Sequence, residues 1–412
     1  MQDYVNFPRL HNQRLLEKSL VVIAALQEED GGIMATPRDD AYPYVYPRDA
    51  VIMTIAMNAL GEYGRSKKFY RFLNGVRRPH GEFYQRYNGG MPYVSNEHEL
   101  DVTPLVLNGI YDTYRKSGDG AFLEEMWGMV KECASFTDSA IDVDAGLVYT
   151  INSIHENRKL EEGFEIWANS AAVRGLLDAS RMAGALGHDD LKDAWASSSR
   201  RLLARIVERL YDKEQGTFIK VMRRSGEKVT APDMTQLAPY YFGVYRDDAA
   251  LEGTLERLRG ALWNKDIGGF NRFRDFEIVD DWHWYTGGNA AAWPFFTLWA
   301  ARSYRNLGIR EGEDDCLAFL DSVLTDDLFI PEKVAPLDRY EEWKANEVKF
   351  GDRTLNGIRK IESNVHKISS PGYVCWACPL GWAHAEYILL EMGEKSRDYE
   401  VLQEGIPSVI KK

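Results

Sequence analysis

The sequence predicts an all-α protein built as an (α/α)6 barrel, a closed ring of six helical hairpins. A chain of 412 residues with 45% hydrophobic residues can bury one large core. An apolar stretch, a turn with glycine and a more charged stretch recur six times along it. The first stretch of each pair is apolar on most helical faces, whereas the second has a charged outer stripe. These patterns favour inner helices wrapped by outer ones; an open solenoid, the alternative, usually shows a tighter repeat.

The hairpins follow one another without a linker that would divide the chain, so residues 1–412 are expected to form a single domain. They are predicted at residues 50–73, 104–130, 168–203, 235–262, 290–324 and 379–403. Left-handed turns between the paired helices are expected at Gly61, Gly118, Gly187, Gly308 and Gly393. Residues 216–226 are predicted to form a strand and a turn. The polar residues 338–370 are predicted to form a long loop, of the kind that often serves as a lid.

Charge and hydropathy exclude two classes of protein. The net charge is −13 and the pI is about 5.2, whereas a protein that coats nucleic acid needs a surplus of Lys and Arg. No run of 18 apolar residues is present, so no transmembrane helix is expected. The first residues, "MQDYVNFPRLHNQ", lack the apolar segment of a signal peptide. We therefore expect a cytoplasmic protein without a nucleic-acid or membrane partner; the sequence does not indicate an oligomeric state.

Candidate metal sites are weak in this sequence. Cys375 and Cys378 have the spacing of a metal or redox motif, and His366 and His384 could complete a zinc site. No second CxxC accompanies them, so core packing is the favoured interpretation. The adjacent pair Asp280–Asp281 lacks the longer acidic pattern that would grip Mg²⁺. We expect neither a metal nor a cofactor.

In a closed ring, the loops that lead into the inner helices meet at one mouth. These loops are predicted at residues 42–49, 96–104, 153–167, 280–289 and 329–370. All five are rich in carboxylates and aromatic residues, and the flat faces of Trp and Tyr suit sugar rings. The first loop places Arg48 and Asp49 as an ion pair at the start of an apolar helix. Charged residues are rarely buried unless they are paired or bind a ligand, so a helix cap or a ligand contact is expected there.

Four motifs resemble glycoside hydrolase family 15, the glucoamylase family. They are "YVYPRDA", "YTGGNAAAWPFFTLWAARSY", "IPEKV" and "PLGWAHAEYI", which follow the family's order between residues 42 and 387. The family's fold is an (α/α)6 barrel, in agreement with the six hairpins. The resemblance implies an exo-acting α-glucosidase that works with inversion and releases β-glucose. The absence of additional modules favours short isomalto- or malto-oligosaccharides as the substrate.

The resemblance also implies two catalytic carboxyl groups. Glu332 in "IPEKV" matches the general base, with Glu362 as a rival because the spacing to Trp382 is long. The family carries its general acid in Asp-Leu-Trp-Glu-Glu, and "FEIWANS" would put Ala168 in the place of the acid. "SIHE" fits better, with Glu156 as the acid. Its rivals are Glu161, Glu162 and Glu165.

The substrate-binding residues follow from the same resemblance. Arg48 and Asp49 would bind hydroxyl groups of the terminal sugar, and the neighbouring tyrosines would stack on its ring or contact the catalytic groups. The full set of candidates is Tyr42, Tyr46, Arg48, Asp49, Asp101, Trp167, Trp282 and Trp284. Asp101 could equally be a helix cap.

Other functions stay open at this point. A trehalase of the same family is one alternative. A catalytically inactive sugar-binding barrel is another, supported by Ala168. A sugar epimerase on the same ring would use histidines, for which His155, His283 and His384 are candidates.

Overall fold

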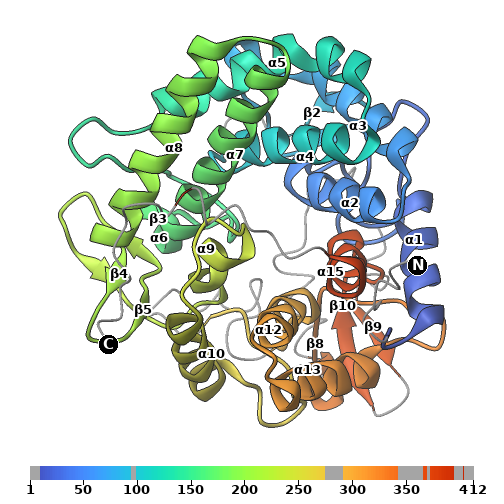
Figure 1. Cartoon of the computed structure of the whole chain (residues 1–412). Coiled ribbons are helices and arrows are strands. Elements are labelled where there is room, and N and C mark those ends of the chain that lie inside the picture. Colours follow the sequence, from blue (N-terminus) through green and yellow to red (C-terminus); the bar gives the residue numbers. More distant parts are fainter. Residues whose placement is uncertain are drawn as a thin grey trace, which may run out of the picture.

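The structure, a computed structural model, describes residues 10–93, 99–273, 291–341, 365–368, 372–393 and 402. Six inner helices form a ring in it (Figure 1). They are α2 (Pro47–Ala59), α4 (Val102–Ser117), α7 (Ile166–Ala185), α9 (Ala238–Tyr241), α12 (Pro294–Leu307) and α15 (Gly381–Met392). Each packs against the next, and α15 packs against α2. The ring is closed, which confirms the predicted (α/α)6 barrel.

Outer helices wrap this ring. Those that follow an inner helix along the chain are α3 (Tyr63–Val76), α5 (Gly120–Ser139), α8 (Asp189–Arg209), α10 (Asp248–Leu262) and α13 (Arg310–Val323). The place beside α15 is taken by α1 (Gln13–Ala25), where Oγ of Ser19 lies 2.9 Å from Nδ1 of His384. The sequence predicted a complete hairpin at residues 379–403. The partner of α15 is instead α1, and beyond Gly393 only Leu402 is described.

The predicted left-handed turns are confirmed at four of the five glycines. Gly118 and Gly308 directly follow α4 and α12 with φ angles of +66° and +75°. Gly61 and Gly187 also have positive φ angles. Gly393 has a φ angle of −66° and extended backbone, so the prediction there is wrong. Without a Cβ atom, glycine adopts the left-handed conformation at little cost, which allows each of the four turns to be short.

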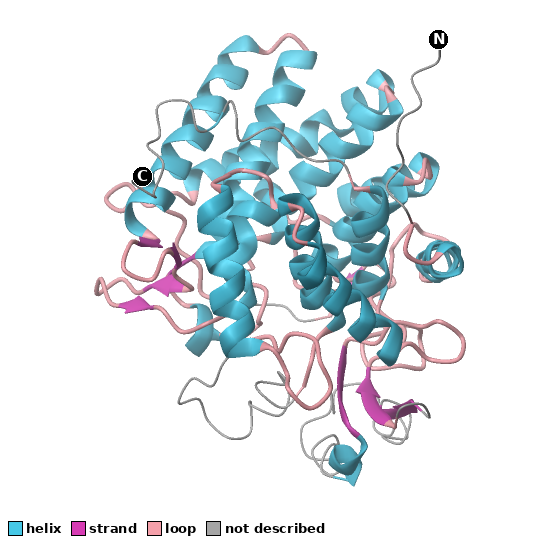
Figure 2. Cartoon of the chain, turned by 60° about the horizontal axis from the view of Figure 1, so that its bottom comes forward, coloured by secondary structure: helices cyan, strands magenta, loops and turns pink. Residues whose placement is uncertain are grey.

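Short strands lie toward one end of the helical ring (Figure 2). They are β1 (Tyr87–Asn88), β2 (Met91–Pro92), β3 (Phe164–Glu165), β4 (Tyr211–Asp212), β5 (Thr217–Phe218), β6 (Val221–Met222), β7 (Lys228–Val229), β8 (Lys333–Pro336), β9 (Val365–Ile368) and β10 (Tyr373–Trp376). Strands β5 and β6 confirm the prediction for residues 216–226. The order β8-β10-β9 is antiparallel, with Val334 opposite Cys375. This pairing fixes the chain directly after Glu332.

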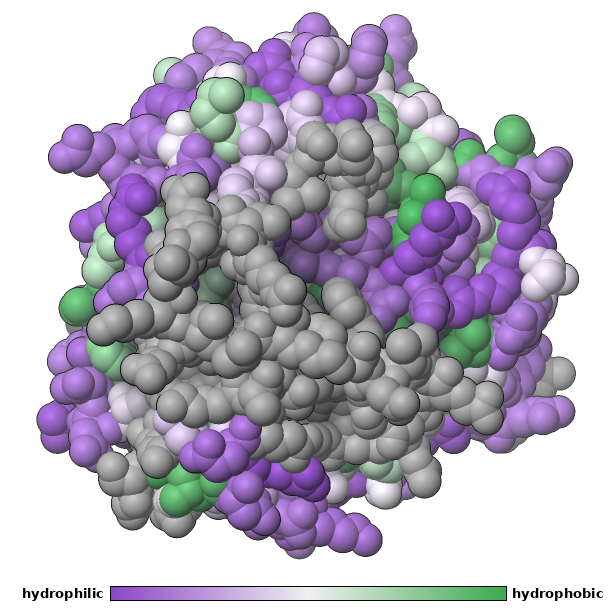
Figure 3. Space-filling view, turned by 180° about the vertical axis from the view of Figure 1, so that it is seen from behind, coloured by the Kyte–Doolittle hydropathy of each residue, from purple (hydrophilic) through white to green (hydrophobic). Residues whose placement is uncertain are grey.

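Four short helices complete the described elements. They are η1 (Pro79–Gly81), α6 (Arg158–Glu161), η2 (Met234–Leu237) and η3 (Leu337–Arg339). Of the predicted long loop at residues 338–370, the central part from 342 to 364 lies outside the described residues. The described surface is largely hydrophilic when it is viewed from behind (Figure 3). In the part of the chain that the structure describes, no helix has the length and apolar character needed to span a bilayer.

Aromatic side chains of the inner helices fill the middle of the ring. The rings of Trp167 and Trp299 stack with their centroids 5.1 Å apart, and those of Trp382 and Phe295 stack at 4.8 Å. All four side chains are buried. This aromatic layer separates a cavity at the N-terminal ends of the inner helices from a cavity at their C-terminal ends, because Phe295 and Trp382 line the first and Trp299 lines the second.

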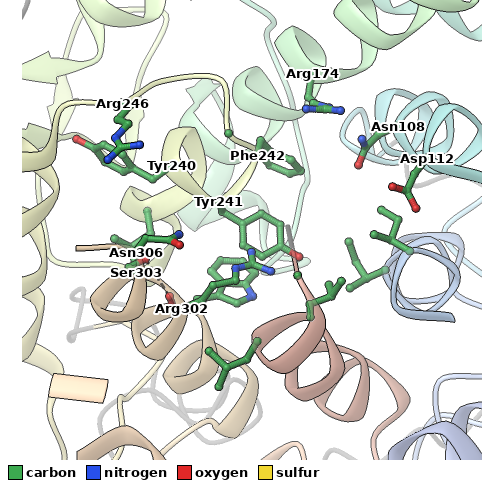
Figure 4. A pocket seen from close by; sticks show the side chains of 18 of the residues that line it. Asn108, Asp112, Arg174, Tyr240, Tyr241, Phe242, Arg246, Arg302, Ser303 and Asn306 are labelled. Carbon is green, nitrogen blue, oxygen red and sulfur yellow. Dashed lines mark hydrogen bonds between the residues drawn. The ribbon is translucent and has the colours of Figure 1, made fainter. Parts of the chain in front are cut away.

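The cavity at the C-terminal ends is the larger of these two, with a volume of about 790 Å³ (Figure 4). Its arginines are held by acids. Arg174 donates from Nε to the buried Asp178 over 2.7 Å, and Nη1 of Arg302 lies 3.6 Å from a carboxylate oxygen of the buried Glu386. Neither Glu156 nor Glu332 lines this cavity. The candidate active site therefore lies at the opposite mouth of the ring.

Candidate active site

The cavity at the N-terminal ends of the inner helices brings together most of the residues predicted from the sequence. The predicted residues that line it are Tyr42, Tyr46, Arg48, Asp49, Glu156 and Glu332. They come from three separate stretches of the chain: the loop before α2 with the first turn of α2, the loop before α7, and the segment before β8. The expectation that the loops meet at one mouth is confirmed for these three. The loop at residues 96–104 reaches the site through Arg48, and residues 280–289 lie outside the described part of the chain. Trp282, Trp284 and the rival base Glu362 are therefore outside the described residues.

Arg48 is held by acids other than the one predicted. Its Nε atom donates to Oδ2 of Asp101 over 2.7 Å, and Nη2 pairs with the carboxylate of Glu99. Nη1 lies 3.4 Å from Oε1 of Glu156. Asp49, the expected partner, makes no described salt bridge with Arg48. Two buried acids from the loop before α4 therefore fix the guanidinium group and direct it toward Glu156.

Asp49 lies in the first turn of α2 and faces the cavity. Burial raises the pKa of its carboxyl group to about 7, although the charge of Arg48 acts in the opposite direction. The neighbouring carboxylates Glu156 and Glu332 also raise it. Near neutral pH this side chain can therefore donate or accept a hydrogen bond, which suits a sugar hydroxyl group.

The predicted sugar contacts of Asp101 and Trp167 are corrected by the structure. Both side chains are fully buried and neither lines the cavity. Nε1 of Trp167 donates to Oδ2 of Asp101 over 2.8 Å, and the same oxygen accepts from Arg48. Asp101 makes no capping hydrogen bond to α4. Asp101 thus supports Arg48 from behind the cavity wall, and Trp167, which belongs to the aromatic layer, holds Asp101 in place.

The loop that carries Glu156 is organised by a buried acid. The carboxylate of Glu161 accepts hydrogen bonds from the backbone N–H groups of Ser153, His155 and Asn157 over 2.9, 2.7 and 3.2 Å. Glu156 itself has a φ angle of +54°, in the left-handed region that non-glycine residues seldom adopt. Such a conformation persists where the surroundings enforce it, often at a functional site. Here it directs the carboxyl group of Glu156 into the cavity.

The rival acids have other contacts. Glu165 caps α7 by accepting from the N–H of Ala168 over 2.8 Å, and Nζ of Lys220 lies 3.1 Å from its other oxygen. Glu162 pairs with the exposed Arg158 over 2.7 Å. Neither of these acids lines the cavity, nor does Glu161. Ala168 is buried in the first turn of α7 and does not line the cavity. Its position is therefore not the one from which an acid would act.

Glu332 lies just before β8 and lines the same cavity as Glu156. The hydroxyl group of Tyr42 donates to its Oε2 over 3.2 Å and accepts from Nε1 of Trp376 over 3.0 Å. Burial raises the pKa of Glu332 to about 7, opposed by the charges of Lys333 and Arg272 and increased by Glu156. Near neutral pH a substantial part of Glu332 is therefore ionised, which is the form that a general base needs.

Other lining residues were not among the predicted site residues. They are Ala35, Ile154, Arg272, Trp293, Phe295, Leu380 and Trp382. His155, which the sequence offered only as a candidate for an epimerase, also lines the cavity. The tryptophans stand inside two of the quoted motifs, which could have indicated them. Arg272 had no such signal, since it follows the fourth hairpin and reaches the cavity only because the ring closes.

The histidine and cysteine candidates have structural contacts. Nε2 of His384 accepts from the N–H of Ile330 over 3.0 Å, so Nδ1 carries the proton and donates to Ser19. Burial lowers the pKa of His384 to about 3. Cys375 is buried in β10. Both nitrogens of His384 are thus engaged in joining α15 to α1 and to the chain before Glu332. The side chain of His366 lies outside the described residues, as does His283.

We expect Tyr42→Phe to move the acidic limb of the pH–rate profile. The base must be ionised, so activity should fall as the pH drops below the pKa of Glu332 at about 7. The tyrosine hydroxyl group stabilises the ionised form by about 1.5–3 kcal/mol. Its loss should raise the limb by about one to two pH units. The measurement is kcat/KM between pH 4 and 9.

Tyr46→Phe is the matched control, because its hydroxyl group bonds to Arg86 over 2.7 Å and not to Glu332. It should leave the position of the limb unchanged. An unmoved limb in Tyr42→Phe would mean that Glu332 is not the group whose ionisation limits the reaction at low pH.

Comparisons with known proteins find similarity to glycoside hydrolases. Residues 151–268 match the family model of the mannosylglycerate hydrolase MGH1-like glycoside hydrolase domain. Over 91% of its length the chain is 24% identical to an uncharacterized glycosyl hydrolase of Methanocaldococcus jannaschii. The chain spans about half of that relative, 55% of its length.

Two solved structures extend the likeness to the fold. A glycosidase variant in complex with glucose has a TM-score of 0.68 and 18% identity, covering 92% of this chain and 97% of its own. A bacterial glucoamylase complexed with acarbose has a TM-score of 0.68 and 16% identity, covering 94% of this chain and 55% of its own. Together with the closed ring of helical hairpins, these likenesses show that the chain has the fold of the six-hairpin glycosidase superfamily.

Proposed function

We propose that the protein is an exo-acting glycoside hydrolase that removes one glucose unit, with inversion, from the non-reducing end of short α-glucosides. The observation that carries the proposal is one cavity lined by two carboxyl groups, Glu156 and Glu332, together with Arg48 and Asp49. Phe295 and Trp382 of the aromatic layer close its inner end. A cavity that is closed at one end admits the end of a sugar chain rather than its middle.

Each group has a role that its contacts support. Glu156 gives its proton to the glycosidic oxygen, and the bond between that oxygen and C1 breaks. Glu332 takes a proton from a water molecule, whose oxygen bonds to C1 from the opposite face. Tyr42 and the nearby cations Arg272 and Lys333 favour the ionised form of Glu332. Arg48 and Asp49 bind hydroxyl groups of the terminal sugar. The products are β-glucose and the shortened sugar, which balances the one water consumed.

A second candidate is a glycosidase for an acidic glycoside such as mannosylglycerate. The family model over residues 151–268 favours it, and Arg272 supplies a cation in the cavity wall. A carboxylate on the leaving group could pair with that guanidinium group. The two candidates share the same cavity and the same pair of carboxyl groups, so they differ only in the substrate.

Proton NMR of the products tests both candidates. Isomaltose, maltose, trehalose and mannosylglycerate are incubated separately, and the anomeric signals are followed from the first minutes, before mutarotation. We expect β-glucose to appear first from isomaltose or maltose. The α-anomer appearing first would contradict inversion, and mannose released from mannosylglycerate alone would favour the second candidate. No turnover of any of the four would favour the inactive barrel.

A further inference from the structure

A row of three buried polar side chains starts in the cavity wall, which two of them line. Arg272, His155 and Asp233 come from three different parts of the sequence and are all at least nine-tenths buried. Nε of Arg272 donates to Nδ1 of His155, and Nε2 of His155 lies 2.7 Å from Oδ2 of Asp233. The ring of His155 also packs edge-on against Phe273, with centroids 5.3 Å apart. Only the closed ring of helices brings these residues together.

The contacts determine where every proton lies. Arginine can only donate, so Nδ1 of His155 must be the acceptor and the proton of the neutral ring is on Nε2. Burial lowers the pKa of His155 well below its ordinary value, which keeps the ring neutral. The other oxygen of Asp233 accepts from the N–H and the hydroxyl group of Thr235 over 2.8 and 2.7 Å. Asp233 thus acts only as an acceptor and selects one tautomer of His155.

Arg272 is oriented by these contacts. Its Nη2 atom donates to the carbonyl oxygen of Ile154, and its guanidinium group lies 4.8 Å from the centroid of the Trp293 ring. Among the described contacts, Nε and Nη2 are engaged by His155 and Ile154. The Nη1 side is left to meet a ligand in the cavity that Arg272 lines.

We propose that Asp233 and His155 are a positioning pair, which sets the guanidinium group of Arg272 for contact with the substrate. The same histidine directly precedes Glu156, so a change in its ring also reaches the loop of the proposed acid. The inference rests on the proposed function for the role of Arg272 in substrate binding. The tautomer of His155 follows from the geometry alone.

Asp233→Asn tests the pair with little change of shape. The amide oxygen should remain with the two donors of Thr235, so the amide NH₂ group faces His155. Nε2 of His155 must then accept and Nδ1 must carry the proton, which meets the N–H of Arg272. Two donors cannot share this contact, and Arg272 should move. A misplacement of about 1 Å can cost about 10²-fold, so we expect kcat/KM to fall by about that factor, with KM raised.

Nitrogen NMR of 15N-histidine-labelled protein gives a readout that does not depend on activity. In the wild-type protein, Nδ1 of His155 should have the shift of an unprotonated nitrogen and Nε2 that of a protonated one, and the pattern should reverse in Asp233→Asn. His155→Gln assigns the signal by removing it. A wild-type His155 protonated on Nδ1 would overturn the proposal even if the enzyme hydrolyses every substrate. The expected tautomer in a protein without turnover would instead count against the proposed function alone.

A double-mutant cycle connects the pair to Arg272. Arg272→Lys keeps the charge but loses the forked geometry. It should lower kcat/KM in the wild-type background and change it less than about twofold in the Asp233→Asn background, since the orientation is already lost. Fully additive losses would overturn the proposal. Asp178→Asn is the matched control, because it also removes a buried carboxylate that holds arginines, at the far cavity. It should leave KM unchanged in the folded protein.

Discussion

Replacing Glu332 by alanine should lower the turnover of the preferred disaccharide by about 10²–10⁴-fold, the usual cost of removing a general base. Binding of glucose should change little, because a base on the far side of C1 contacts the attacking water rather than the sugar. The structure sharpens this expectation, since Arg48 has Glu99 and Asp101 as partners and does not depend on Glu332. Turnover is measured at saturating substrate, and glucose binding by titration calorimetry.

A small anion should partly replace the missing carboxylate. Azide can enter the space left in Glu332→Ala and attack C1 itself, so an activated glucoside should give the β-glucosyl azide. The matched control is Glu162→Gln, which changes an acid that pairs with Arg158 outside the cavity and should leave turnover unchanged. If Glu332→Ala keeps more than about a hundredth of the wild-type turnover, the base is another residue, and Glu362 is the next to test.

The helical ring could be predicted because its cause is local. An inner helix such as α7 is buried on most faces, and its apolar periodicity is visible in any short window of the sequence. Closure of the ring was less visible. The partner of α15 is α1, from the other end of the chain, and no local pattern connects two segments about 360 residues apart. The inner helix α9 is also much shorter than its predicted stretch.

The site could be predicted where a residue's role depends on its own motif. Tyr42 and Arg48 lie in the cavity as expected, together with the two proposed catalytic acids. The sequence could not tell which acids hold Arg48, because Glu99 and Asp101 reach it from another loop. The positioning pair escaped for the same reason. A buried histidine gives no signal until the fold brings an aspartate and an arginine to its two nitrogens.

Several acids near Glu156 competed for its role, and contacts separate them where spacing did not. Glu161 holds the backbone of the loop, and Glu165 caps α7 beside Lys220. Neither carboxyl group lines the cavity, so neither lies where it could give a proton to a bound sugar. This difference in position predicts different consequences for replacing Glu156 and for replacing Glu161.

Glu156→Gln should cripple the hydrolysis of a disaccharide while largely sparing a substrate with an activated leaving group. A sugar leaving group needs a proton as the bond to C1 breaks, whereas an aryl group or fluoride departs with little help. General-acid catalysis contributes about 10²–10⁴-fold, so the loss on isomaltose or maltose should be of that order and much smaller on α-glucosyl fluoride. The alkaline limb of the pH–rate profile, which reports loss of the acid's proton, should also disappear.

Glu161→Gln is the contrasting variant. It disturbs the loop through the N–H groups of Ser153 and His155, so it should slow both substrates alike and keep the alkaline limb. If Glu156→Gln behaves in that second way, Glu156 positions the site without giving a proton. If no acid in the loop distinguishes the two substrates, the inactive sugar-binding barrel becomes the better account of this cavity.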